Sequence, residues 1–143
     1  MILVVDASVV IKWFVRETLH SEATAMLAGS DGLYAPDLLL SEVANIAWKK
    51  AVRQEIAPQQ AARIAAACLD GVPSIVPSIG LVERALQMAL SLAHPVYDCL
   101  YLACAETIGG VLVTADEEFC RKVRQTALAP RVRLLGAMME GGG

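Results

Sequence analysis

The 143-residue sequence predicts an α/β domain built on a mostly parallel sheet. Residues 2–5 form an apolar run in which no polar residue alternates, as in a strand buried on both faces of such a sheet. Further along the chain, short apolar runs alternate with longer helix-like stretches, the pattern of right-handed β-α-β crossovers. We therefore expect a mostly parallel sheet of about five strands covered by helices.

Each element is predicted from its composition and from the residues that begin or end it. Strands are expected over residues 2–5, 33–35, 74–76, 111–114 and 132–135, the last at an edge of the sheet. Helices are expected over residues 7–14, 19–28, 37–54, 58–70, 78–93 and 97–108, and in a segment opened by Asp116. Gly29 and Gly109 act as stops, Asp37 as a cap, and Pro58 suits a first helical turn. One domain is expected over residues 1–136, with residues 137–143 as a flexible C-terminal tail.

Composition limits the class of protein. The chain is 56% hydrophobic, yet no stretch approaches the roughly 18 uninterrupted apolar residues of a membrane span, so we expect no membrane partner. The excess apolar surface is expected to lie in a protein interface. No export signal is seen ahead of the first strand, which predicts a cytoplasmic protein. The four cysteines lack metal-type spacing and are expected to be buried, reduced thiols.

The net charge of −3 excludes a protein that coats nucleic acid indiscriminately, because that mode of binding needs an excess of Lys and Arg. Any binding to nucleic acid must be local. Basic clusters occur at residues 49–53 and 121–124, and each is more typical of a solvated helix face.

Four acidic residues fall at positions where chemistry is expected. Asp6 ends the first strand and Asp116 follows the fourth, so both should lie at the carboxyl edge of the sheet, where such sheets bind ligands. Asp98 begins an almost wholly apolar helix. Each of these three also has a plain explanation as a helix N-cap. Glu42 is different, since one turn inside its helix it cannot be a cap.

Carboxylates that converge on one crevice raise each other's pKa unless a cation offsets them. Carboxylates and water are the ligands of Mg²⁺ or Mn²⁺, whereas Zn²⁺ prefers His or Cys, and His20 and His94 have no suitable spacing. A metal held in this way activates water and neutralises an attacked phosphate. The acids therefore indicate nuclease chemistry.

The same residues carry a resemblance to a known family. Four segments resemble, in order, the PIN-domain ribonucleases of the VapC toxin type: DAS at 6–8, APDLLLSEVAN at 35–45, YDCLYLA at 97–103 and TADEEF at 114–119. The resemblance implies a three-layer α/β/α sandwich, Mg²⁺- or Mn²⁺-dependent RNA cleavage, and an antitoxin partner. It implies that the acidic quartet is Asp6, Glu42, Asp98 and Asp116, with Thr114 as the polar residue beside the last acid.

Roles follow as hypotheses from this resemblance. We expect Asp6, Asp98 and Asp116 to hold the metal directly or through water, while Glu42 orients or deprotonates the attacking water. The residues expected to support the four acids are Thr114, Ser8, Asn45 and Glu117.

Other residues are given RNA, partner or structural roles. The stripe formed by Asn45, Lys49 and Arg53 leads away from Glu42 along one helix, so Lys49 and Arg53 are expected to guide the RNA backbone. His94, before a proline, is expected to be a turn residue. Aromatic residues at apolar helical positions are expected in the core rather than against bases: Trp13, Trp48, Tyr97 and Tyr101. The apolar surroundings of Trp13 and Trp48 are a possible groove for an antitoxin peptide or a homodimer contact.

Three alternatives stay open at this stage. A phosphotransfer domain also has carboxylates at strand ends, but the Asp-x-Asp spacing of haloacid-type phosphatases is absent after Val5, and Pro77-Ser78 replaces the acid that a receiver domain needs. A nucleotide-binding module lacks its Gly-x-Gly-x-x-Gly sequence. The third alternative is a protein that keeps the fold, binds a partner and has lost catalysis.

Overall fold

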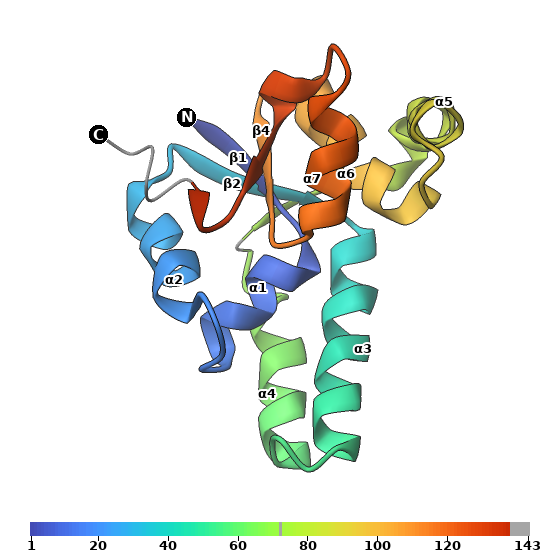
Figure 1. Ribbon diagram of the computed structural model, residues 1–143. Coiled ribbons are helices and arrows are strands. Elements are labelled where there is room, and N and C mark those ends of the chain that lie inside the picture. The colour runs from blue at the N-terminus through green and yellow to red at the C-terminus, as the bar shows by residue number, and fades with distance from the viewer. Residues whose placement is uncertain (72, 138–143) are drawn as a thin grey trace.

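The computed structural model describes residues 1–71 and 73–137, which form a five-stranded sheet with all neighbouring strands parallel (Figure 1). The strand order is β3-β2-β1-β4-β5. The strands are β1 (Ile2–Val5), β2 (Gly32–Pro36), β3 (Ser74–Val76), β4 (Val111–Thr114) and β5 (Val132–Leu134). The predicted number of strands is confirmed, and β5 lies at an edge as expected.

The central strand β1 explains why its sequence lacks alternation. It pairs with β2 on one side and β4 on the other, with Val4 opposite Tyr34 and Leu112. Leu3, Val4 and Val5 are buried. Both faces of this strand are covered, so polar side chains have no place on it.

The helices fill the connections between the strands. They are α1 (Ala7–Phe14), α2 (His20–Gly29), α3 (Leu38–Val52), α4 (Pro58–Ala67), α5 (Val82–Leu92), α6 (Val96–Ile108) and α7 (Glu117–Arg124). Short 3₁₀ turns stand at Ser78–Gly80 and Ala129–Arg131. Helices α3 and α4 pack side by side and extend away from the sheet (Figure 1).

The direction of the chain across the sheet places the helices in two layers. The chain passes from β1 to β2 to β3 in one direction, then crosses back to β4 and on to β5. Right-handed crossovers therefore put α1–α4 on one face and α5–α7 on the other. Helix α6 packs against β1, β2 and β4, and its apolar segment is buried, as expected. The predicted α/β/α sandwich is confirmed.

The helix predicted over residues 78–93 differs from the structure at its start. The chain first makes the 3₁₀ turn Ser78–Gly80, and α5 begins only at Val82. Gly80 in this turn is a poor helix former, which favours the later start. Asp37 precedes α3 but makes no capping bond with its side chain, and its carboxylate instead accepts the Ser78 hydroxyl. That bond ties the start of α3 to the segment after β3.

Two aromatic residues contradict the expectation of burial. Trp48 is 59% exposed and Tyr97 is 63% exposed. Trp48 lies in the second half of α3. Helices α3 and α4 extend away from the sheet together (Figure 1). Tyr101 is buried as expected, and Trp13 is partly buried with its indole N–H donated to the Ala23 carbonyl at 2.9 Å.

The cysteines and the lengths of the helices bear on two further expectations. Cys68, Cys99, Cys104 and Cys120 are all buried and unbridged, as predicted. No single helix in residues 1–71 and 73–137 has the length and apolar character to cross a bilayer. Helices α5 and α6 reach that threshold only as a pair bent by 118°. The expected C-terminal tail falls largely outside the described residues, which end at residue 137.

Candidate active site

The candidate site lies where the order of the strands reverses. Strand β1 leads to α1 on one face of the sheet, whereas the neighbouring strand β4 leads to α7 on the other face. The two connections diverge at the carboxyl ends of β1 and β4 and leave a crevice there. Open parallel sheets bind ligands in such a crevice. Asp6 directly follows β1. Asp116 stands two residues after Thr114, the last residue of β4, with Ala115 between them.

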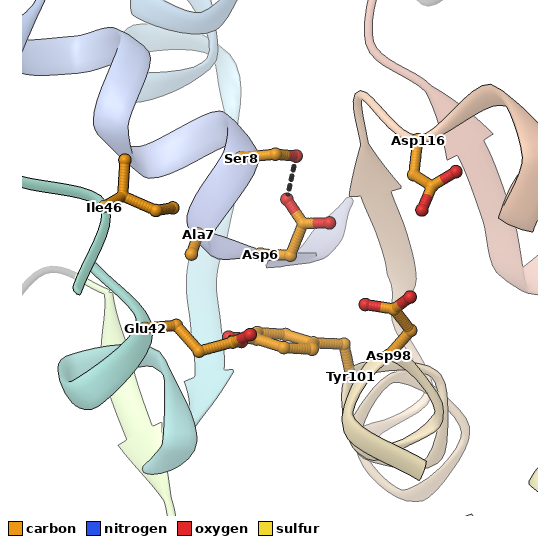
Figure 2. Close-up of a pocket in the computed structure, with 8 residues that line it drawn as sticks. All are labelled: Asp6, Ala7, Ser8, Glu42, Ile46, Asp98, Tyr101 and Asp116. Carbon is orange, nitrogen blue, oxygen red and sulfur yellow. Dashed lines mark hydrogen bonds between the residues drawn. The ribbon is translucent and has the colours of Figure 1, made fainter. Parts of the chain in front are cut away.

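The two other acids reach the same crevice from helices. Helix α3 starts at the carboxyl end of β2 and presents Glu42 at its fifth position, one turn in. Helix α6 runs back towards β4, so its first turn, which holds Asp98, lies at the same edge. The four acids line one pocket of about 170 Å³ together with Ala7, Ser8, Ile46 and Tyr101 (Figure 2). The structure thus brings together the four carboxylates that the sequence places far apart.

Asp6 serves as a helix cap and also faces the pocket. Its Oδ1 accepts the backbone N–H of Val9 at 3.2 Å and the hydroxyl of Ser8 at 2.6 Å, and its Oδ2 accepts the hydroxyl of Thr114. Burial raises the pKa of Asp6 to about 6, although these three donors act in the opposite direction, and the charge of Asp98 raises it further. Ser8 and Thr114 therefore contact Asp6 by direct hydrogen bonds.

Asp116, at the start of α7, also caps a helix and faces the pocket. Its Oδ1 accepts the backbone N–H of Phe119 at 3.0 Å, and its own N–H donates to Thr114 Oγ1 at 3.1 Å. Thr114 is almost completely buried and links Asp6 to Asp116. Asp6 and Asp116 therefore each cap a helix and also line the pocket.

Asp98 has no capping role, because the N-cap of α6 is Pro95 and no side-chain capping bond forms there. Its side chain is 36% exposed, and its Oδ2 lies 2.6 Å from Nε2 of His94. One ligand atom from each of His94, Asp98 and Asp116 lies within 4.8 Å of the others. Figure 2 shows Asp98 and Asp116 turned towards the same space as Asp6.

Glu42 occupies the other side of the pocket, beside the ring of Tyr101 (Figure 2). The Tyr101 hydroxyl donates to Glu42 Oε1 at 2.5 Å. Burial raises the pKa of Glu42, an effect that the Tyr101 bond opposes and the charge of Asp98 reinforces. Burial, followed by the bond to Glu42, raises the pKa of Tyr101 as well, so its hydroxyl keeps its proton and acts as a donor.

The charge of the pocket fits a hard divalent cation. Helices α1, α6 and α7 begin at this edge, and the partial positive charge of their first turns favours carboxylates there. This effect is modest for each helix, and the raised pKa of Asp6 shows that negative charge in the crevice is still costly. The donors are oxygens of carboxylates, which suit Mg²⁺ or Mn²⁺. The ligand atoms of His94, Asp98 and Asp116 are close enough together to share an ion, and Asp6 lines the same pocket.

Some predicted site residues lie outside the pocket. Asn45 and Glu117 are exposed and are not part of its lining. Lys49, in α3, and Arg53, the C-cap of that helix, are exposed and continue the stripe of Asn45. That stripe therefore has the accessibility that a path for RNA requires.

Two residues at the site were given only structural roles from the sequence. Tyr101 was expected in the core, and it is buried, but its hydroxyl ends at Glu42. His94 was expected in a turn, and it stands between α5 and α6, but its ring contacts Asp98. His94 and Asp98 are four residues apart, but His94 precedes α6, so the helical spacing of contacting side chains did not apply to this pair.

Comparisons with known proteins agree with this fold. Residues 3–125 match the family model described as PIN domain. The curated protein Ribonuclease VapC3 of Pyrobaculum aerophilum is 33% identical over 124 residues, which cover 85% of this chain and 95% of that protein.

Solved structures with lower sequence identity share the fold. The PAE2754 protein of Pyrobaculum aerophilum superposes with a TM-score of 0.72 at 22% identity, over 97% of this chain and 87% of that one. VapC20 of Mycobacterium tuberculosis, a sarcin-ricin loop cleaving toxin, gives a TM-score of 0.66 at 17% identity, over 83% of this chain and 93% of that one. VapBC2 of Rickettsia felis, bound to promoter DNA, gives a TM-score of 0.62 at 10% identity, over 94% of this chain and 98% of that one. From the family match and the sequence identity to VapC3, the chain belongs to the PIN-domain family.

Proposed function

We propose that this protein is a metal-dependent endoribonuclease that acts as the toxin of a toxin-antitoxin pair. The observation that carries the proposal is the convergence of Asp6, Glu42, Asp98 and Asp116 on one pocket at the carboxyl edge of the sheet. The name of the relative VapC3, a ribonuclease, supports RNA as the substrate. The VapC20 toxin, which shares the fold, supports the biological role.

In this proposal, Asp6, Asp98 and Asp116 hold Mg²⁺ or Mn²⁺, directly or through water. When bound, such an ion activates water and neutralises charge on the attacked phosphate. Ser8 and Thr114 fix the Asp6 carboxylate by donating to its two oxygens, so that its orientation does not change when a ligand enters.

Glu42 is placed to act on the water. Its raised pKa makes it a better proton acceptor than an exposed carboxylate, and Tyr101 holds one of its oxygens. Glu42 takes a proton from the water, the water oxygen bonds to phosphorus, and the P–O ester bond on the opposite side breaks. The departing oxygen leaves with a proton from solvent. The result is hydrolysis of one phosphodiester bond of the RNA chain.

The RNA backbone is proposed to follow the exposed stripe of Lys49 and Arg53. Lys49 lies in α3 and Arg53 is the C-cap of that helix, both further along the chain than Glu42. Two Lys or Arg side chains on one helix face neutralise phosphates locally, which is consistent with a chain whose net charge is −3.

Protein partners are proposed from the exposed apolar side chains. Leu90 is 77% exposed and Val52 is 63% exposed, and Val82 and Leu86 continue the stripe of Leu90 along α5. Such continuous apolar surface is uncommon on a monomer. We assign these surfaces to a homodimer and to an antitoxin, the latter in keeping with VapBC2, and we place the protein in the cytoplasm. Chromatography with light scattering, without and with the product of a neighbouring small gene, tests both assignments.

The experiment that tests the function is cleavage of RNA by the purified protein with Mg²⁺ or Mn²⁺, repeated with EDTA. Cleavage that needs the metal, stops with EDTA and is lost in Asp98→Asn supports the proposal. A protein that binds its partner yet cleaves no RNA under any metal condition has kept the fold without catalysis, and the proposal is then wrong.

A further inference from the structure

His94 is held in place more firmly than an ordinary turn residue. The preceding Ala93 has φ 51 and ψ 52, a left-handed conformation, and Pro95 follows with its fixed φ. The His94 side chain is 8% exposed, and its ring lies 4.6 Å from the ring of Phe119, centre to centre. Backbone and ring contacts together leave the imidazole little freedom to rotate.

Lys122 of α7 fixes the same turn from the other side. Its ammonium nitrogen lies 3.0 Å from the carbonyl oxygen of Ala93 and 3.1 Å from Nδ1 of His94. Oε1 of Glu118 lies 3.9 Å from the same ammonium nitrogen. The sequence placed Lys122 in a basic cluster on a solvated helix face, whereas in the structure it is partly buried.

The contact with Lys122 determines which ring nitrogen carries the proton. An ammonium group only donates hydrogen bonds, so Nδ1 of His94 accepts. Nε2 then carries the N–H and donates it to Oδ2 of Asp98 at 2.6 Å. A ring in the other tautomer would present a lone pair to the carboxylate, and the bond to Asp98 would be lost.

We propose that Lys122 and His94 form a positioning chain behind Asp98, in which Lys122 selects the tautomer of His94 and His94 orients the Asp98 carboxylate towards the metal. This inference rests on the proposed metal site. With Oδ2 engaged by His94, the second oxygen of Asp98 is left to bind the ion. Partners of this kind, behind a metal ligand, fix its orientation and its basicity. His94 is thus a positioning residue and does not itself touch the metal.

The test measures binding of Mn²⁺ to metal-free protein from the electron paramagnetic resonance signal of unbound Mn²⁺, with no RNA present. His94→Ala is expected to weaken Mn²⁺ binding by about 10- to 100-fold. His94→Gln, whose amide nitrogen occupies the place of Nε2 and donates, is expected to restore most of the affinity. Lys122→Met is expected to weaken binding severalfold, because both tautomers of His94 become available.

Arg121→Met is the matched control for Lys122→Met. It makes the same change of charge one residue earlier on α7, at an exposed position. It is expected to bind Mn²⁺ as the unaltered protein does. Circular dichroism confirms that each variant is folded, and Lys122→Met keeps the test decisive if His94→Ala does not fold.

Three results overturn the inference. If folded His94→Ala and Lys122→Met bind Mn²⁺ as tightly as the unaltered protein, His94 positions nothing. If the bound Mn²⁺ shows a hyperfine coupling to imidazole nitrogen that His94→Ala removes, His94 is a direct ligand. If the unaltered protein binds no Mn²⁺, the metal site itself is wrong, and this outcome is distinct from the other two.

Discussion

The phenol oxygen of Tyr101, on α6, lies 2.5 Å from a carboxylate oxygen of Glu42, on α3. These helices belong to opposite faces of the sheet, and the bond joins them across the carboxyl edge. Tyr101 is almost completely buried, so its hydroxyl depends on Glu42 for a partner. One side chain therefore contributes to the core with its ring and to the pocket with its hydroxyl.

Tyr101→Phe should separate these two contributions. The ring volume is preserved, so the fold should lose only about 1 kcal/mol of stability. The Tyr101 bond lowers the pKa of Glu42, and its loss should raise that pKa further. Since the ionised form of Glu42 accepts the proton, the acid limb of the pH profile of RNA cleavage should move to higher pH. An unchanged profile would show that Glu42 is not the base.

Asp6→Asn should stabilise the metal-free protein at neutral pH. The pKa of Asp6 is about 6 in the folded protein against 3.8 ordinarily, so ionised Asp6 costs about 3 kcal/mol of folding free energy. The folded protein is more stable when Asp6 is protonated. This contribution of protonated Asp6 to stability is fully present below about pH 4 and is lost as the pH rises through 6. Asn caps helices as well as Asp does.

Urea unfolding in EDTA at several pH values measures this effect. The free energy of unfolding of Asp6→Asn should exceed that of the unaltered protein by about 1–3 kcal/mol near pH 8. This difference should vanish towards pH 4. Cleavage of RNA should be abolished throughout. A variant that is less stable than the unaltered protein near pH 8 would contradict the assigned cost of the Asp6 charge.

The affinity for the metal should rise with pH, whereas the stability contributed by protonated Asp6 falls as pH rises. The ion displaces the proton of Asp6, so affinity should fall by up to about tenfold for each pH unit below 6. Calorimetric titration with Mn²⁺ at a series of pH values gives this slope. If the affinity for Mn²⁺ does not change through pH 6, the metal does not displace a proton from Asp6.

The positions of the acids at strand ends were predictable because parallel strands all end at one edge of a sheet. Asp6 and Asp116 follow buried apolar runs, and that pattern alone places both at the carboxyl edge. The pattern leaves open whether each acid only caps a helix. The structure resolves this because both caps face the same pocket.

The contacts of His94 and Tyr101 were not predictable in the same way. Hydrophobic periodicity shows that Tyr101 is buried, but it does not distinguish the centre of the core from the floor of a pocket. The partner of His94 besides Asp98 is Lys122, on a different helix. The exposure of Trp48 depends on how far α3 extends past the sheet, which is a tertiary property.

Charge reversal at Lys49 and Arg53 should weaken RNA binding without altering Mn²⁺ affinity. Both side chains are exposed, Lys49 in α3 and Arg53 at its C-cap, and neither lines the pocket. The double variant Lys49→Glu with Arg53→Glu should also bind RNA with a weaker dependence on salt, because two phosphate contacts are lost. Filter binding with uncleaved RNA, in EDTA, measures the affinity at several salt concentrations.

The matched control reverses Arg63 and Arg124, which are exposed on α4 and α7. It changes the net charge by the same amount at other places on the surface. Equal losses in the two double variants would show a general effect of charge, and no loss in the first would remove α3 from the RNA path.

The central claim is that four acids distant in the sequence form one pocket for a hard dication. Anomalous diffraction from a crystal soaked in Mn²⁺ tests it most directly. We expect a manganese peak bounded by Asp6, Asp98 and Asp116, at about 2.0–2.3 Å from the carboxylate oxygens that bind it directly. A crystal in which manganese occupies other sites, or none, while this pocket is open to solvent would contradict the account.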